Sequence, residues 1–425
     1  MNLKKQLYSP LYLVLGFNVF TLIFFITAPF DWSQGKPNAV ILYLLVNYLF
    51  IFLGYKFGLK RSLLSRVNIK HIFSTVNSNL TKFIFIFYLL TFLVKYAYLL
   101  RFSIFDVSGM FSYLLIGLFD SELGYNLSVY DYRPHTISWI LFIFVSLFNQ
   151  LFFIYGFLCW RNIRVYYRIL FVFFVCVELF YWLGRGTGYG VISLVSTFAI
   201  CYFISLKEKK INLRSLLLYS VLIISVFLFY GTLKNLRAGG GEVDLNQFDL
   251  GMAAVQDDHY IFSVIPKSQT QGYMHNTSYL TQGYYHLGLA MTLEDDFNST
   301  LLLGNNPASI NLLKSFDFDL WQQTYMYRLS VEKGVDDLGK WHSAYLWYAN
   351  DVSLYGVPFI MFILAYLMAY SYGLVLSSND LLSKILFVIF VNMLLYNFAN
   401  NTYLYHHFYS LTMLLLIWLP TRLLK

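Results

Sequence analysis

Long apolar runs are the feature that most limits what this chain can fold into. A bilayer core takes about 20 apolar residues per helix, and ten runs approach that length. They are Leu11–Thr27, Val40–Tyr55, Phe83–Leu100, Ser138–Leu158, Ile169–Leu183, Tyr189–Leu206, Ser215–Leu233, Val352–Leu376, Leu381–Ala399 and Tyr403–Leu419. Because a backbone in lipid must satisfy its own hydrogen bonds, these runs predict helices. We expect an all-α, polytopic integral membrane protein with about ten transmembrane helices.

The composition excludes the ordinary soluble classes. Hydrophobic residues make up 58% of the chain and charged residues only 12%, whereas soluble domains carry about a quarter charged residues. The net charge of +8 would suit a nucleic-acid partner, but the bases cluster between apolar runs and form no basic stripe, so we expect none. Cys159, Cys176 and Cys201 all fall inside apolar runs, and we expect them to be reduced core residues.

The loops carry opposite charges on the two sides of the predicted membrane domain. Sixteen Lys and Arg residues between Lys4 and Lys425 fall on one side, whose clear acids are Glu208 and Asp380. Most acidic residues fall on the other side. Since cytoplasmic loops are enriched in Lys and Arg, we expect both termini to be cytoplasmic and the acidic loops to lie outside.

One long polar segment, residues 234–350, separates the seventh and eighth runs. It contains 13 acidic and 7 basic residues. No internal repeat, low-complexity tract or linker marks a second soluble domain. We therefore expect residues 1–425 to form a single membrane domain, with the loop 234–350 carrying part of an active site.

A glycine-rich turn, Gly184–Gly190, joins the fifth and sixth runs on the outer side. The sixth helix would start there, so the amides of Gly186 and Thr187, the positive end of the helix dipole and the Arg185 guanidinium would converge. That arrangement suits a phosphate. A tight turn whose Arg185 reaches lipid headgroups explains the same residues equally well.

Two further charges lie near the same outer surface. Arg237 follows the seventh run and precedes glycines that would let a ligand approach closely, although a flexible helix exit is the simpler interpretation. Glu178 lies seven residues before Arg185, on the same helical face and about 10 Å deeper. We interpret Glu178 as a structural partner of Lys95 in the third run rather than as a functional group.

Two motifs in the long loop have simpler interpretations than chemistry. Asp317 and Asp319 have the Asp-x-Asp spacing that holds a metal in nucleotide-sugar enzymes. Nucleotide sugars are absent outside the membrane, so we interpret the pair as solvated surface. The stretch Tyr279–Met291 is amphipathic, and we expect it to be re-entrant or interfacial, with its aromatic rings forming an interfacial belt.

His342 is the candidate base, because it lies just outside the eighth run and a neutral imidazole accepts protons near pH 7. A lone interfacial His is more often simple polar filler. Trp341, Tyr345 and Tyr348 would complete a short interfacial helix around it, and Asp351 would cap the next helix without orienting the imidazole.

We expect no metal site and no cofactor. The adjacent His406 and His407 would face different sides of a helix, and the sequence has no Cys/His cluster with metal-ligand spacing.

The topology and four patches together resemble the O-antigen polymerase family, the Wzy-type oligosaccharide repeat-unit polymerases. The resemblance covers most of the length. The patches are Gly184-Arg185-Gly186, Arg237, Thr281-Gln282-Gly283-Tyr284-Tyr285, and Trp341-His342-Ser343-Ala344-Tyr345 running into Asp351-Val352-Ser353-Leu354-Tyr355-Gly356.

The resemblance implies a membrane glycosyltransferase of the GT-C type in the bacterial inner membrane. It would join oligosaccharide units carried on undecaprenyl diphosphate into O-antigen or capsular polysaccharide, on the periplasmic face and without nucleotide sugar or metal. A chain-length regulator protein is an expected partner, besides membrane lipids. The rival interpretations are an O-antigen ligase of the same superfamily and a flippase or transporter for lipid-linked oligosaccharide.

The resemblance also implies roles for individual residues. His342 would be the general base on the acceptor hydroxyl. The diphosphate-binding residues would be Arg185, Arg237, Arg328, Gly186 and Thr187. The sugar-binding residues would be Tyr284, Tyr285, Trp341 and Tyr345.

Overall fold

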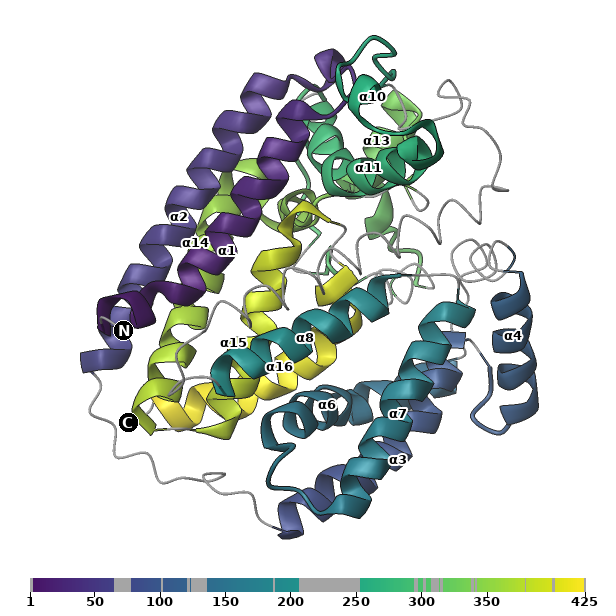
Figure 1. The fold of residues 1–425 in the computed structure, drawn as a ribbon, viewed down its shortest axis with the longest axis vertical. Coiled ribbons are helices and arrows are strands. Elements are labelled where there is room, and N and C mark those ends of the chain that lie inside the picture. The colour runs from purple at the N-terminus through teal and green to yellow at the C-terminus, as the bar shows by residue number, and fades with distance from the viewer. Residues whose placement is uncertain are drawn as a thin grey trace. The chain divides into compact units, whose positions relative to one another are not determined.

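The computed structural model describes most of the chain as helices (Figure 1). The described residues are 3–64, 78–100, 102–120, 123, 136–185, 188–205, 253–293, 297–300, 303–306, 313, 316–337, 340, 342–378, 380–399 and 402–423. Within them, the one piece of β pairing is an isolated bridge between Phe30 and Val255. The predicted seventh span, Ser215–Leu233, and the start of the long loop lie outside these residues.

Seven of the described helices contain segments long and apolar enough to cross a membrane. They are α1 (Leu3–Thr27), α2 (Pro37–Leu64), α3 (Ser78–Leu100), α6 (Thr136–Cys159), α7 (Val165–Gly184), α14 (Ala344–Ser378) and α15 (Leu381–Leu395). Shorter apolar segments form α8 (Tyr189–Ser205) and part of α16 (Thr402–Leu423). These nine helices overlap nine of the ten predicted spans. The chain is thus an all-helical polytopic membrane protein, while the number of spans stays a prediction.

The membrane helices expose apolar side chains on their outer faces. Ile23 on α1 is 53% exposed, Leu42 on α2 is 65% exposed and Phe144 on α6 is 68% exposed. A surface helix of a soluble protein has one apolar stripe, which faces the core, and polar residues on its outer face. Apolar outer faces are what helices in contact with lipid present.

The chain divides into two compact units. Unit 1 comprises Met1–Gly54, Ile211–Ala365 and Met393–Tyr405, and unit 2 comprises Tyr55–Lys210, Tyr366–Asn392 and His406–Lys425. The single membrane domain expected from the sequence stays a prediction.

In unit 1, α11 (Lys267–Ala290) is the longest helix among the described residues of the long loop. It contacts α1 and three short elements, namely η1 (Ser33–Gly35), α13 (Tyr325–Lys333) and η4 (Tyr396–Phe398). Two glycines permit these approaches: a Cβ on Gly288 would lie 1.8 Å from the carbonyl oxygen of Gly35, and one on Gly283 would lie 2.4 Å from that of Phe398. Two small helices, α10 (Ile261–Val264) and η3 (Leu320–Gln323), also lie among the described residues of the loop.

α11 is a polar helix that is nevertheless buried. Every residue from 281 to 290 is buried, including Thr281, Gln282 and His286. The expected interfacial aromatic belt at Tyr279–Met291 is therefore wrong. Amphipathic spacing identified the helix, but the covering elements come from distant parts of the sequence and bury both of its faces.

Unit 2 is built on aromatic packing between membrane helices. α3 packs along α6, and α8 contacts both α6 and α7. The ring of Tyr88 stacks on Phe152 at 3.7 Å and meets Phe174 edge-on at 5.0 Å. A short helix, α4 (Val107–Phe119), packs against α3 and α7. Asp106 caps its N-terminus by accepting a hydrogen bond from the amide of Gly109.

The expectation for the three cysteines is correct in part. All three are free thiols, and Cys159 and Cys201 are buried. Cys176 is exposed on α7, so the prediction of a core position is wrong there. Hydropathy alone does not tell which face of an apolar helix turns outward.

Small residues let α2 and α14 pack closely, as GxxxG spacing does in membrane helices. Within unit 1, a Cβ on Gly54 would lie 2.2 Å from the carbonyl oxygen of Phe362, and within unit 2 one on Gly58 would lie 2.2 Å from that of Tyr366. Backbone atoms cannot move aside as a flexible side chain does. Only glycine fits at these two positions.

We predict that Gly54→Ala destabilises the protein by about 1–3 kcal/mol, because the added methyl group overpacks the contact. Gly16→Ala on α1 is the control, since a Cβ there meets nothing within 4 Å. The free energies of unfolding of both variants are measured in detergent, with circular dichroism as the probe of helix content. Equal midpoints for the two variants would contradict this account of the helix contact.

Candidate functional site

His342 lies in unit 1 immediately before α14, and His286 on α11 faces it. The two ring centroids are 5.0 Å apart, with the ring planes inclined at 45°. Both side chains are 0% exposed. Sequence reasoning did not single out His286. The one available signal was that His286 lies in the same polar loop as His342, although the two residues are 56 positions apart in the sequence.

Burial keeps His342 neutral. Removal from water lowers the pKa of His342 well below its usual value, and the neighbouring His286 lowers it further. The Asp336 backbone, which faces the ring, acts in the opposite direction. The site therefore contains an unprotonated imidazole at neutral pH, which is the form that accepts a proton.

The tyrosines proposed to bind sugar are buried in unit 1. The ring of Tyr285 lies 5.9 Å from that of His286, and the rings of Tyr284 and Tyr345 lie 6.5 Å apart. The hydroxyls of Tyr284 and Thr21 share a 2.9 Å hydrogen bond, and the Tyr345 hydroxyl donates to Asn18 Oδ1 at 3.4 Å. The ring of Tyr285 lies 5.2 Å from that of Trp32.

All three tyrosines are 0% exposed. Burial raises the pKa of Tyr284 to about 12 and that of Tyr285 to about 12, so both remain protonated donors at neutral pH. Their ring faces meet protein atoms, and sugar binding by them stays a prediction.

The Asp351 carboxylate forms a clamp, by which we mean that it binds the preceding loop through hydrogen bonds from Thr300, Gly304 and Asn305. Its Oδ1 accepts hydrogen bonds from Thr300 Oγ1 at 2.5 Å and from the Gly304 amide at 3.1 Å, while its Oδ2 accepts from Asn305 Nδ2 at 2.7 Å. The expected capping role is wrong, because the Asp351 carboxylate accepts hydrogen bonds from these residues, and the non-helical residue that interrupts α14 is Ser353, two positions later.

A backbone break follows the clamp directly. Ser353 has φ 61° and ψ 169°, so α14 is divided there into a short helix that begins at Ala344 and a longer membrane segment. This conformation is nearly confined to glycine and costs a residue with a side chain about 1–3 kcal/mol. Strain of this kind persists only where surrounding contacts enforce it, and the Asp351 clamp is such a contact.

Arg328 and the Asp-x-Asp pair also belong to unit 1. The Arg328 Nε lies 3.6 Å from Glu332 Oε1 on the same helix, and the guanidinium lies over the ring of Tyr325. Asp317 is exposed, and Asp319 caps η3 by accepting a hydrogen bond from the Trp321 amide at 3.2 Å. The interpretation of this pair as surface agrees with these positions.

Arg185 lies in unit 2, at the C-terminal end of α7. Its Nη1 donates a 2.9 Å hydrogen bond to the Tyr181 hydroxyl, and its guanidinium lies 5.7 Å and 5.5 Å from the ring centroids of Tyr181 and Trp182. The aromatic rings thus hold the cation at the helix end by cation–π attraction.

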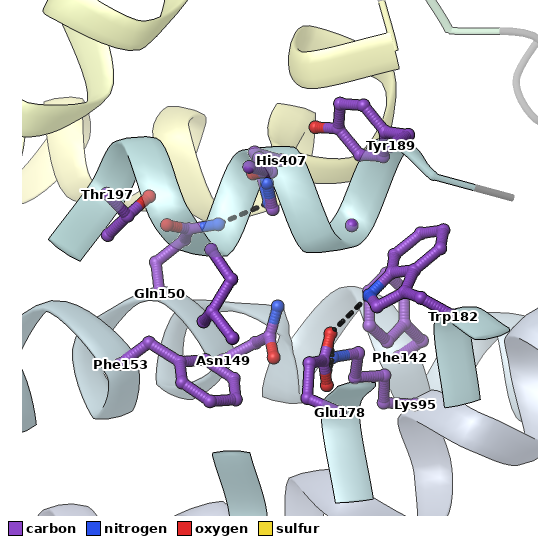
Figure 2. A pocket seen from close by; sticks show the side chains of 13 residues that line it. Lys95, Phe142, Asn149, Gln150, Phe153, Glu178, Trp182, Tyr189, Thr197 and His407 are labelled. Atoms are coloured by element: carbon purple, nitrogen blue, oxygen red, sulfur yellow. Dashed lines mark hydrogen bonds and ion pairs between the residues drawn. The ribbon is translucent and has the colours of Figure 1, made fainter. Parts of the chain in front are cut away.

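Glu178 pairs with Lys95, as the sequence predicted. Lys95 Nζ lies 2.7 Å and 2.6 Å from the two carboxylate oxygens. The Tyr96 hydroxyl donates to the same carboxylate at 2.7 Å. The Trp182 indole N–H also donates to it, at 2.8 Å (Figure 2). All the charge-bearing atoms of this pair are therefore hydrogen-bonded away from water, as a buried pair requires.

A small polar cavity of unit 2 adjoins this ion pair (Figure 2). It measures about 50 Å³, which leaves room for a few water molecules. Asn149 Oδ1 is buried there without a hydrogen-bond partner among the described residues, and Gln150 is hydrogen-bonded to His407 Nδ1. A signal for this cavity was present in the sequence, since Asn149 and Gln150 are adjacent polar residues inside an apolar run.

The remaining predicted site residues lie outside the described residues: Arg237, Gly186, Thr187 and Trp341. The structure brings His342, Tyr284 and Tyr345 together within unit 1. In unit 2 it links Arg185 to Glu178 through Trp182. Among the described residues, no group of three or more His, Cys, Asp or Glu side chains is arranged to hold a metal ion.

The fold and the buried polar clusters define a class, namely an all-helical polytopic membrane protein with ionisable groups inside its helical units. Comparison with protein-family models, with curated proteins and with solved structures finds no match for this chain.

We predict that His342 makes the protein less stable in acid. Below pH 6.5 the unfolded imidazole binds a proton that the folded one, with its lowered pKa, does not. The free energy of unfolding should then fall by up to about 1.4 kcal/mol per pH unit. Detergent unfolding at pH 7, 6 and 5 should show a smaller slope for His342→Gln than for the wild type. His259→Gln, at a partly exposed position, is the control, and equal slopes for all three proteins would refute the prediction.

We predict that Glu178→Gln costs about 3–5 kcal/mol, because it leaves the Lys95 charge buried without its counter-charge. The double variant Lys95→Met with Glu178→Met removes both charges and should cost much less. Reversible unfolding in mixed detergent measures both. A double variant as unstable as Glu178→Gln would show that the shape of the site, and not charge pairing, matters most.

Proposed function

We propose that this protein is a membrane glycosyltransferase that polymerises oligosaccharide repeat units carried on undecaprenyl diphosphate. The product would be O-antigen or capsular polysaccharide, made on the periplasmic face of the bacterial inner membrane, with both termini of the enzyme in the cytoplasm. The observation that carries the proposal is a neutral His342 at the entrance of a membrane helix, inside the patch that resembles the O-antigen polymerases. The polar helix α11 from the long loop packs beside this base and places the His286 ring 5.0 Å from it.

The reaction needs one base and a set of cations. The acceptor hydroxyl oxygen attacks the anomeric carbon of the growing chain, and its proton passes to His342. The bond between that carbon and the diphosphate oxygen breaks, and undecaprenyl diphosphate leaves with the electron pair. Guanidinium groups match phosphate geometry and stabilise the charge that develops. Arg185, Arg237 and Arg328 are proposed for this role, with Gly186 and Thr187 as amide donors.

The present geometry requires movement before catalysis. His342 is fully buried, so an acceptor hydroxyl reaches its ring only after the residues that cover it separate. Tyr284, Tyr285, Tyr345 and Trp341 are proposed to contact sugar in that open state. Long periplasmic loops commonly supply such gating. A chain-length regulator is the proposed protein partner, and no cofactor is required by this scheme.

A transporter or flippase of lipid-linked oligosaccharide is the second candidate, favoured by one observation. Ionisable groups inside membrane helices often mark transport or proton pathways, and the Lys95–Glu178 pair adjoins a polar cavity. That cavity has room for water but not for an oligosaccharide. A ligase of the same superfamily uses the same donor and differs only in its acceptor.

One assay separates these functions. Purified protein receives a lipid-linked repeat unit with no nucleotide and no divalent metal, and the products are resolved by gel electrophoresis. We expect a ladder of chain lengths, which identifies a polymerase. Transfer of the intact donor to added core lipid would identify a ligase. Neither product, together with translocation in liposomes, would identify a flippase and end the polymerase proposal.

Two variants test the proposed roles in that assay. His342→Ala removes the base and should lower the rate by about 10²–10⁴-fold. Arg185→Ala removes a cation and should lower it by about a hundredfold or more. His259→Ala and Arg168→Ala are matched controls, the latter on the same helix as Arg185. Wild-type ladders from either test variant would remove that residue from the mechanism.

A further inference from the structure

An apolar groove runs along unit 2 between α3, α4 and α7. Its volume is about 550 Å³, which is in the range of pockets that hold small ligands. Its walls are apolar apart from tyrosine hydroxyls and the Cys176 thiol. Phe92, Leu100, Met110, Phe111, Phe180 and Tyr181 are among the residues that form them.

One end of this groove reaches a fixed cation. Tyr181 lines the groove, and its hydroxyl accepts the 2.9 Å hydrogen bond from Arg185. Leu114 also lines it, and a Cβ on Gly184 would lie 2.8 Å from the Leu114 carbonyl oxygen. α4 therefore crosses α7 at the residue next to Arg185, and the apolar walls end beside a guanidinium.

The groove is shorter than the thickness of one bilayer leaflet, which is about 15 Å, half of the hydrocarbon core. Its walls extend from Phe92 to Leu100 on α3 and from Phe173 to Tyr181 on α7, which is about 12 Å along each helix. A bilayer core is about 30 Å thick. The groove thus accommodates the first part of a hydrocarbon chain that continues into lipid.

We propose that this groove binds the isoprenoid chain of the lipid donor at the segment next to its diphosphate, with Arg185 at the anionic headgroup. The inference rests on the proposed function for the identity of the lipid. One groove that ends at one cation suits a lipid with a single chain under an anion, whereas a diacyl phospholipid brings two chains side by side. Apolar burial supplies most of the affinity, and the guanidinium fixes the register of the chain.

The test uses a photoreactive probe that does not depend on turnover. The full-length protein in phosphatidylcholine nanodiscs is irradiated with geranylgeranyl diphosphate carrying a diazirine on its isoprenoid chain, and the labelled residues are mapped by mass spectrometry. We expect labelling within residues 92–100, 107–114 and 173–181. Labelling spread over other outward-facing apolar helices, such as α1 and α2, would overturn the proposal.

Two matched variants on α7 test the groove itself. Val177 lines it, whereas Val172 is exposed to the outside and does not. Val177→Trp should reduce labelling by about tenfold or more, because the indole fills the space of the chain, and Val172→Trp should leave it unchanged. Equal labelling in the two variants would refute the groove as the binding site. Mapping on the wild-type protein keeps the test valid should Val177→Trp misfold.

The source of the ligand and the role of Arg185 are tested by competition. Unlabelled geranylgeranyl diphosphate should displace the probe, and phosphatidylglycerol at the same concentration should not. Displacement by both lipids alike would make the site a phospholipid site and overturn the proposal. Arg185→Gln should weaken labelling by the diphosphate probe but not by a geranylgeraniol probe, and equal weakening of both would remove the guanidinium from the headgroup role.

The outcome is independent of the polymerisation assay. Groove labelling by a protein that forms no ladder would support an isoprenoid site and reject the polymerase. A ladder from a protein that shows no groove labelling would support the polymerase and reject this site.

Discussion

A polar group withdrawn from water must find a partner inside the protein, and the architecture described here depends on that requirement. In lipid, the backbone meets it by forming helices. Side chains meet it locally, as Glu178 does with Lys95, Tyr96 and Trp182. On the buried polar helix α11, the Thr281 hydroxyl donates a hydrogen bond to the Thr277 carbonyl, and the Tyr284 hydroxyl shares one with Thr21. The chemistry proposed for this protein lies at these buried polar positions.

Much of the membrane architecture could be predicted from the sequence, because the length and hydropathy of each run are local properties. The pairing of Glu178 with Lys95 could also be predicted, since two opposite charges at similar depth in lipid have few other partners. The surface position of Asp317 was predicted on chemical grounds, because a metal-binding Asp-x-Asp pair serves nucleotide sugars, which are absent outside the membrane. In the first two cases the deciding physics acts within one helix or at one depth of the bilayer.

The rest depends on how helices turn about their axes and on contacts between distant segments. Cys176 faces outward although its run is as apolar as that of Cys201. Asp351 binds residues about 50 positions earlier instead of capping a helix. The partnership of His342 with His286 requires α11 to be enclosed, which no local pattern reveals. The candidate base was found from its position and residue type, but its surroundings were not.

The break at Ser353 divides α14 into two helical segments with different surroundings. The short segment begins two residues after His342 and contains Asp351, which accepts hydrogen bonds from Thr300, Gly304 and Asn305. The longer segment is apolar and long enough to cross a membrane. The direction of the short segment beside His342 is therefore set by contacts with residues about 50 positions earlier, and not by continuation of the membrane helix.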